Sequence, residues 1–338
     1  MTIGKHAKWL MCLPMFVLFV GCGHEEKAYK EKLDVKTTKT PALSFDRYEE
    51  VLFHLDTARF KEELISVQQD YLPFLEGDLS DPSAVQYLKD FATDTFSIML
   101  YHKVMQHYPD INEIRRLSES VYSHFQYYYP DAPLPCHFYT CVSGVHPDIP
   151  PVMLVGDAVV ISLDWYLDKD DIYDRIGMPQ YRSERTSLLN LACDLGLLLY
   201  DHFVADDHVQ TTVLEEMVHE GRRLFFAEAL CPSLPDEILL GYSKEQLAWA
   251  NANEGGLWAD IVGNQRLYST EFEMFRTFFA DGPFTHEYSY DAPSRLGVFL
   301  GLQIVRSYMG NNEVSVQELM CEHDLQAIFQ ASGYKPKK

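Results

Sequence analysis

The stretches LLNLACDLGLLLY, Leu188–Tyr200, and LEEMVHEGRRLFF, Leu214–Phe226, decide the fold of this chain. Apolar residues recur at positions 188, 191, 195, 198 and 199 of the first stretch, and apolar or small ones at 214, 217, 218, 221 and 225 of the second. This spacing predicts two helices that each bury a wide apolar stripe in a core. Each helix also carries polar groups at the margin of its stripe, and these groups are the first candidates for a functional site.

The composition indicates a globular protein with an acidic surface. Of its 338 residues, 47% are hydrophobic and 13% are aromatic, which provides ample material for a core. The formal net charge is -22, from 50 acidic side chains against 28 basic ones. Because such a surface repels phosphates, we exclude nucleic acid as a partner.

The N-terminus has the pattern of an export signal. Two lysines precede an apolar run, Trp9–Val20, that is too short to span a bilayer. The run ends in Phe19-Val20-Gly21-Cys22, which resembles a bacterial lipobox with Phe19 where leucine is usual. The pattern therefore predicts a signal peptide over residues 1–21 and a lipid on Cys22 that anchors the protein to a membrane. The alternative is an ordinary signal peptide in which this cysteine occurs by chance.

The segment after Cys22 is predicted to be a tether. Residues 22–42 are rich in Lys, Glu and Thr and show no periodic apolar pattern, so we expect a flexible connection to one domain over residues 43–338. Glu25 and Glu26 form a short acidic cluster that is similar to the surface-display signal of lipoproteins from the Bacteroidetes phylum. The expected location is the outer membrane, on either its periplasmic or its exposed face.

The domain is predicted to be α+β and predominantly helical, with a small sheet between helical layers. The pattern is helical from residue 45 to 128, and we expect helices over 47–71, 82–107, 110–127, 244–253, 295–309, 315–320 and 324–330, with a further helical region over 255–279. Two strands are expected over 136–142 and 153–163, the second bent or bulged at Gly156. Gly297 and Gly301 lie one turn apart, where missing side chains let another element approach closely.

The cysteines do not predict a disulfide framework. Those after Cys22 are Cys136, Cys141, Cys193, Cys231 and Cys321, an odd number without metal-finger spacing. Cys136 and Cys141 share a predicted strand at an odd separation, so they point to opposite faces. We expect buried free thiols.

Four segments stand in a specific order. They are ISLDWYL (161–167), PQY (179–181), HEGRRLFF (219–226) and DAPSRLGVFLGLQIVRSYM (291–309). Together with the lipobox they resemble the gliding-motility lipoprotein family known as GldB, over most of the chain from Cys22 onward. The resemblance implies an outer-membrane lipoprotein of Bacteroidetes-type bacteria, linked to gliding or to the related secretion machinery, whose partners are other envelope proteins.

That family is in turn distantly similar to zincin-like metallopeptidases, in which a helix carries H-E-x-x-H. The two histidines bind zinc, the glutamate acts as base, and a later glutamate is the third ligand. Here Cys193, Asp194 and Leu197 stand at the first three positions and Glu220 at the last. Because Leu197 cannot bind a metal and Cys193 replaces an imidazole, the resemblance implies a degenerate zincin-like domain without a metal, a cofactor or catalytic residues. The strand over 153–163 would be the edge strand above its cleft.

The candidate residues of this relic cleft are Cys193, Asp194, Glu220 and Arg295. Glu220 lies beside the buried stripe of its helix, where we expect a structural salt bridge with Arg223 or Arg295. His219 lies on the polar face, within reach of Glu215, so we expect it in solvent and not on a metal.

Three hypotheses of function follow. The leading one is a lipid-anchored, non-catalytic accessory or assembly component of an envelope machinery. The second is a metal-dependent, peptidase-like hydrolase of the envelope with a nonstandard ligand set, Glu220 with Cys193, Asp194 or His202. The third is a surface lipoprotein that binds oligosaccharides or peptides through aromatic side chains such as Trp249, Trp258 and Tyr268, although their helical spacing favours a place in the core.

Overall fold

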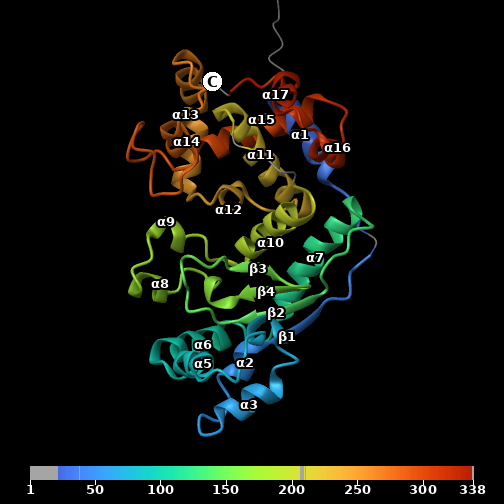
Figure 1. Ribbon diagram of the computed structural model, residues 1–338. Coiled ribbons are helices and arrows are strands. Elements are labelled where there is room, and N and C mark those ends of the chain that lie inside the picture. The colour runs from blue at the N-terminus through green and yellow to red at the C-terminus, as the bar shows by residue number, and fades with distance from the viewer. Residues whose placement is uncertain (1–21, 38, 206–208, 210, 337–338) are drawn as a thin grey trace, which may run out of the picture.

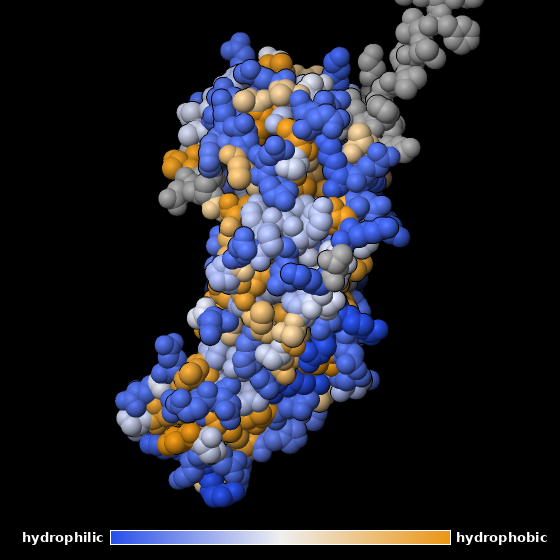
Figure 2. Space-filling view, turned by 90° about the vertical axis from the view of Figure 1, so that its right-hand side faces the viewer, coloured by the Kyte–Doolittle hydropathy of each residue, from blue (hydrophilic) through white to orange (hydrophobic). Residues whose placement is uncertain are grey.

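The computed structural model describes residues 22–37, 39–205, 209 and 211–336. The predicted signal peptide, residues 1–21, lies outside them. The molecule is elongated and mostly helical: a large helical group occupies one end, a small sheet the middle and a smaller helical group the other end (Figure 1). Figure 2 shows a face that is largely hydrophilic, with hydrophobic residues scattered along its length and most extensive at the lower left.

Four short strands form a mixed sheet in the order β1-β2-β4-β3. They are β1 (Ser44–Arg47), β2 (His137–Cys141), β3 (Val152–Val155) and β4 (Ala158–Ser162). Strand β2 is parallel to both β1 and β4, whereas β3 is antiparallel to β4. The single bent strand predicted over 153–163 is wrong, because Gly156 adopts φ +61° and forms a two-residue turn with Asp157. Strand β1 also lies where the pattern predicted helix.

The two faces of this sheet belong to two separate cores. Phe138, Val159 and Ile161 point into the main core, which the helices of the large group share. Their neighbours Tyr139 and Val160 point to the opposite face, into a second core with the smaller helical group. Side chains alternate between faces along a strand, so β2 and β4 are covered on both sides. The prediction of a sheet between helical layers is confirmed (Figure 1).

The chain before β2 is helical but more broken than predicted. Its helices are α2 (Tyr48–Leu52), α3 (Phe60–Val67), α4 (Leu72–Leu75), α5 (Pro82–Thr93), α6 (Thr95–His107) and α7 (Asn112–Tyr128). The helix predicted over 82–107 breaks at Asp94, whose backbone is extended at ψ 136°. The Asp94 carboxylate accepts hydrogen bonds from the backbone N–H groups of Phe96 and Ser97 at 2.8 and 3.0 Å, which caps α6.

The two helices predicted first are confirmed as α10 (Leu188–Phe203) and α11 (Val213–Leu230). Capping boxes begin both: Ser187 with Asn190, and Thr212 with Glu215. The long helix predicted over 295–309 is α15 (Leu296–Asn311), which packs along α11. The remaining elements are η1 (Leu163–Trp165), α8 (Asp171–Arg175), α9 (Gln180–Ser183), α12 (Asp236–Leu240), α13 (Lys244–Gly263), α14 (Phe272–Phe279), α16 (Val316–Cys321) and α17 (Leu325–Ser332).

The flexible tether predicted over 22–42 is corrected by helix α1 (Cys22–Leu33), which packs on α15. Tyr29 and Leu33 lie one turn apart and are both buried, and the Tyr29 ring meets Phe225 at 6.1 Å between centroids. The Lys32 ammonium donates hydrogen bonds to the carbonyl of Met309 at 2.7 Å and to that of Asn312. Two apolar residues one turn apart were too few to predict a helix, but they dock this segment on the main core.

The free thiols are confirmed, although they are not all buried. Cys141, Cys193 and Cys231 are buried, whereas Cys136 and Cys321 are exposed. Cys136 lies just before β2 and Cys321 ends α16, where neither faces a core.

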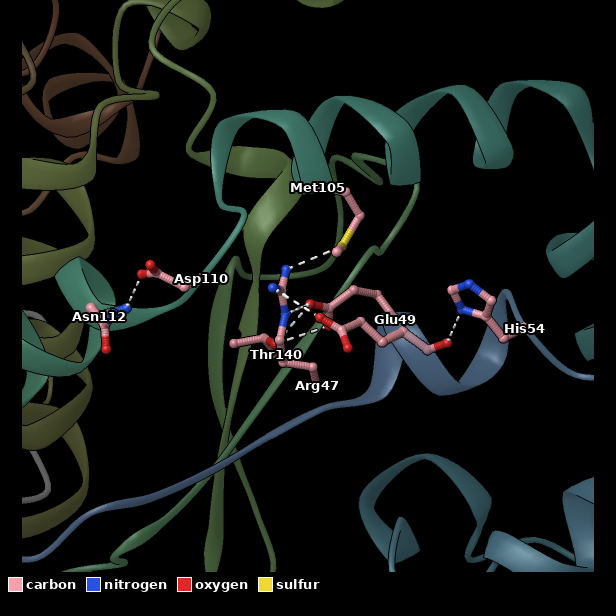
Figure 3. Close-up of polar contacts among 8 residues, drawn as sticks. Arg47, Glu49, His54, Met105, Asp110, Asn112 and Thr140 are labelled. Carbon is pink, nitrogen blue, oxygen red and sulfur yellow. Dashed lines mark hydrogen bonds and ion pairs between the residues drawn. The ribbon is translucent and has the colours of Figure 1, made fainter.

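A buried polar cluster joins β1, α2 and β2 (Figure 3). Glu49 is fully buried and accepts hydrogen bonds from Arg47 Nε at 2.7 Å and from the Thr140 hydroxyl at 2.9 and 3.0 Å. Burial raises the pKa of Glu49, and the Arg47 guanidinium opposes that rise. The carboxylate has several partners, so the cluster stabilises the point where the chain leaves the sheet.

Candidate functional site

A cleft of about 420 Å³ lies between α10, α11 and the start of α15. Its floor and walls include Cys193, Asp194 and Leu197 on α10, together with Arg223 and Leu224 on α11. The loop over 147–151 and Trp165 close another side. The structure therefore joins the two helices predicted first with the start of the third in one concave site.

Three of the four predicted cleft residues line this cavity: Cys193, Asp194 and Arg295. Glu220 does not line it, and its carboxylate approaches the Arg223 guanidinium at 3.9 Å. The expected Glu220–Arg223 salt bridge is thus a loose contact. An ion pair between Glu220 and Arg295 is not formed among the described residues.

The two histidines considered from the sequence lie apart from the cleft lining. His202 is exposed, and its ring nitrogen contacts the carbonyl of Leu198 one turn earlier. His219 is half-buried with its ring 6.4 Å from that of Tyr200, so the expected solvent-exposed position on the polar face is corrected. Packing of α10 on α11 is the reason, because it covers a face that the helix alone would expose.

Asp194 is a carboxyl group of the cleft with a raised pKa. Its carboxylate accepts a hydrogen bond of 2.6 Å from the hydroxyl of Tyr166, which follows β4. Burial raises the pKa of Asp194 to about 6, while the Tyr166 hydrogen bond and the charges of Arg185 and Arg223 limit the rise. Asp194 can therefore bind or release a proton just below neutral pH.

Cys193, the preceding residue, has the properties of an unreactive thiol. The side chain is buried, and burial together with the Asp194 carboxylate raises the pKa of the thiol to about 12. Because the thiolate is the nucleophile and the metal ligand, a neutral thiol favours a packing role.

Four arginines surround the cleft: Arg182, Arg185, Arg223 and Arg295. Arg223 forms a two-pronged ion pair with Asp201, at 2.8 and 2.7 Å. Arg185 binds both carboxylate oxygens of Asp281 at 2.9 and 3.3 Å and donates to the carbonyl of Gly241 at 3.1 Å. Sequence reasoning missed both pairs, since their members are far apart in the chain and carry no motif.

Arg295 has an unusual backbone and few partners. It adopts a left-handed conformation, φ 58° and ψ 35°, directly before α15. Its guanidinium makes one long hydrogen bond, 3.4 Å to the carbonyl of Leu240. Burial lowers the pKa of Arg295, and the nearby charge of Arg185 lowers it further. Strained backbone of this kind is typical of functional positions.

The cleft residues do not fit a bound metal cation. No group of three His, Cys, Asp or Glu side chains lies close enough to hold a metal within the part of the chain that the structure describes. Leu197, whose side chain offers no donor atom, lines the cavity beside Cys193 and Asp194. The guanidinium groups of the lining arginines also repel a cation, so this donor set suits an anion better.

Two residues of the family-like segments have structural roles. Asp164 is fully buried, and its carboxylate accepts hydrogen bonds from the backbone N–H groups of Ser143 at 3.0 Å and Val145 at 2.9 Å. Arg306 on α15 forms paired hydrogen bonds with Glu228 at 2.9 and 3.0 Å and with Asp236 at 2.7 and 2.9 Å. Asp164 therefore holds the loop after β2, and Arg306 ties α11, α12 and α15 together.

The aromatic residues of the third hypothesis do not form one surface. Trp258 packs against Phe329 and Tyr334, with ring centroids at 5.7 and 5.1 Å, and Trp249 is half-buried. Tyr268 is 57% exposed. The two tryptophans are thus partly buried against the core, as expected, whereas the prediction of a core position is wrong for Tyr268.

The fold and the cleft define a mostly helical protein with a small mixed sheet and an arginine-lined cavity. The family model of gliding motility protein GldB matches residues 29–336, so the chain belongs to this lipoprotein family. The resemblance seen in the sequence is confirmed, and membership suggests a membrane anchor and a gliding machinery context. Searches of curated proteins and of solved structures gave no significant match. Among the described residues, no helix is both long and apolar enough to cross a bilayer.

Proposed function

We propose that this protein is a lipid-anchored component of the outer membrane that serves the gliding machinery, or the related secretion machinery, as a non-catalytic accessory or assembly component. The observation that carries the proposal is the charge of the cleft. Four arginines line it, and under the zincin-like hypothesis they would surround the place where a metallopeptidase holds its cation. In this proposal the domain is a degenerate zincin-like one, in which Cys193, Asp194, Glu220 and Arg295 mark a site that has turned from catalysis to binding.

The anchor of the proposal is a lipid on Cys22. Helix α1 begins at this residue and is docked on the core by Tyr29, so seven steps along the helix separate the two. At 1.5 Å per residue they span about 10 Å. A body joined so closely would stay beside the bilayer, where it can contact other envelope proteins.

Replacing Cys22 by alanine tests the anchor. In a gliding host, Cys22→Ala should leave the outer-membrane fraction, appear in the soluble fraction and abolish colony spreading, because acylated cysteine supplies the membrane affinity. Cys12→Ala, within the predicted signal peptide, is the matched control and should retain both. Membrane fractionation of Cys22→Ala that equals wild type would refute the anchor.

The non-catalytic part of the proposal is tested by metal analysis. Zinc in the purified lipoprotein, measured by mass spectrometry after dialysis, should be far below one ion per chain. Tightly held, near-stoichiometric zinc would count against the proposal, because the lining arginines should exclude it.

A metal-dependent hydrolase remains the second candidate, with Glu220 and Cys193, Asp194 or His202 as its residues. Only Asp194 favours it, because a pKa of about 6 suits an acid or base near neutral pH. The exposed position of His202 speaks against a shared ligand set. This candidate requires that Glu220→Gln abolish a hydrolytic activity while the far-ultraviolet circular dichroism stays unchanged.

A further inference from the structure

We propose that the arginine-lined cleft binds an oxyanion, a carboxylate or a phosphate group, that terminates a small apolar ligand, and that Arg182 and Arg295 hold it. The inference deepens the proposed binding role of this site. It can fail separately, because its experiment measures affinity and not membrane attachment or metal content.

The first step is the pairing of charges in the cleft. Arg185 is matched by Asp281, and Arg223 is matched by Asp201. For Arg182 and Arg295, no ion pair with a carboxylate is formed among the described residues. With 50 acidic and 28 basic side chains in the chain, two half-buried arginines without an acidic partner are unexpected.

The acidic groups of the cleft form no ion pair with these two arginines within the described residues, although the charges of Glu220 and Asp281 act on Arg295. Asp194 is held by the Tyr166 hydroxyl at 2.6 Å. The side chain of Asp148 is 88% exposed at the rim, near His146. Two guanidinium groups are thus left to act on whatever enters the cavity, and their planar forks match carboxylate and phosphate oxygens.

The backbone adds to the positive potential. Helix α15 begins with Leu296, directly after Arg295, and no side chain caps its N-terminus. The first N–H groups of a 16-residue helix and its dipole favour an anion at that end. Arg295 lines the cavity and directly precedes the first residue of α15, so this helix end is next in the chain to a residue of the lining.

The remaining lining indicates what the anion is attached to. Proline and isoleucine side chains of the loop over 147–151, together with Trp165, Leu197 and Leu239, give the cavity apolar walls. A volume of about 420 Å³ accommodates a small molecule or a chain end. The class of ligand is therefore an amphipathic acid, such as a peptide C-terminus with apolar last residues or an alkyl phosphate.

The test uses the full-length lipoprotein in detergent and isothermal titration calorimetry. The probes are N-acetyl-leucyl-leucine, its C-terminal amide and butyl phosphate. At least one acid should bind, and the amide should bind at least about tenfold more weakly than the free peptide if the carboxylate is the ligand group. Tighter binding of butyl phosphate would support the oxyanion site and assign it to a phosphate. If neither acid binds, or if the amide binds like the free acid while butyl phosphate does not bind, the proposal is wrong.

Variants locate the site. Arg295→Gln and Arg182→Gln should each weaken binding of the preferred acid about tenfold or more, since each removes a charge-assisted contact. Arg59→Gln, in a surface ion pair on α3's N-terminal side, is the matched control and should bind like wild type. Arg182 lies in the short helix α9 and not in α10, α11 or α15. Arg182→Gln therefore keeps the test valid if Arg295→Gln fails to fold. Equal affinity of Arg182→Gln and wild type would overturn the assignment.

Discussion

Gly221 on α11 and Gly301 on α15 face each other so closely that a methyl group on Gly221 would collide with the carbonyl group of Gly301. A methyl group on Gly301 would in turn collide with the carbonyl of Met217. The two helices thus cross backbone to backbone, with no side chain between them. Arg223 lies two residues after Gly221 and Arg295 directly precedes α15, so the two crossing helices carry two of the arginines that line the cleft.

Gly301→Ala should lower the free energy of unfolding by about 2–4 kcal/mol, because the added methyl group must push apart two buried backbones. Gly256→Ala is the matched control in α13, where a methyl group would meet no atom within 4 Å. It should stabilise the protein by about 0.5–1 kcal/mol, the usual gain for alanine over glycine in a helix. Urea denaturation followed by circular dichroism measures both. A Gly301→Ala variant as stable as wild type would contradict the close crossing.

Helix α1 should act as part of the domain. Leu33 is 1% exposed on the main core, so Leu33→Ala should cost about 2–4 kcal/mol in the free energy of unfolding. Lys36→Ala, at an exposed position just beyond the helix, should change it by less than about 0.5 kcal/mol. The same denaturation measurement separates them. If the two variants were equally stable, the result would support the flexible tether predicted over residues 22–42.

The long helices could be predicted because their signals are local. Apolar spacing and cap residues, such as Ser187 before α10 and Thr212 before α11, lie within a few residues of what they determine. The spacing of Gly297 and Gly301 in α15 likewise predicted a close contact with another element, although only the structure identifies Gly221 as the partner of Gly301. By contrast, β1 has four residues and pairs with a strand that lies about ninety residues later, so no local pattern marks it.

The candidate site also has a part that could be predicted from the sequence and a part that could not. Cys193, Asp194 and Arg295 could be singled out from helix margins and from family resemblance, and they meet in one cavity. The charge of that cavity could not be predicted, because it depends on which arginines find an acid. Arg185 finds Asp281 across 96 residues, and such pairing follows only from the folded topology.

The buried ion pairs of Arg306 give a third prediction. Arg306→Met should lower the free energy of unfolding by about 3–5 kcal/mol, since Glu228 is 4% exposed and would be left without its cation. Adding Glu228→Gln should recover part of that loss, because burial already raises the pKa of Glu228 and the amide carries no charge. Arg276→Met, in an exposed pair with Glu273, should cost less than about 0.5 kcal/mol. Failure of Glu228→Gln to recover any stability would show that packing, not charge, dominates at Arg306.

Asp194 should make stability depend on pH in a direction opposite to that of ordinary paired carboxylates. Its pKa rises from 3.8 to about 6 on folding, so the folded state holds the proton more tightly than the unfolded state. The Asp194 charge therefore costs stability above pH 6, and this cost disappears as the pH falls toward 4. Asp194→Asn carries no charge and can still accept from Tyr166, so its advantage over wild type should grow by roughly 1–3 kcal/mol between pH 4 and pH 7, at about 1.4 kcal/mol for each pKa unit. Asp148→Asn at the exposed rim is the control, and denaturation at each pH should show no such growth. An Asp194→Asn advantage that is constant across this range would mean that the carboxylate is charged throughout and that the cleft holds it as an anion.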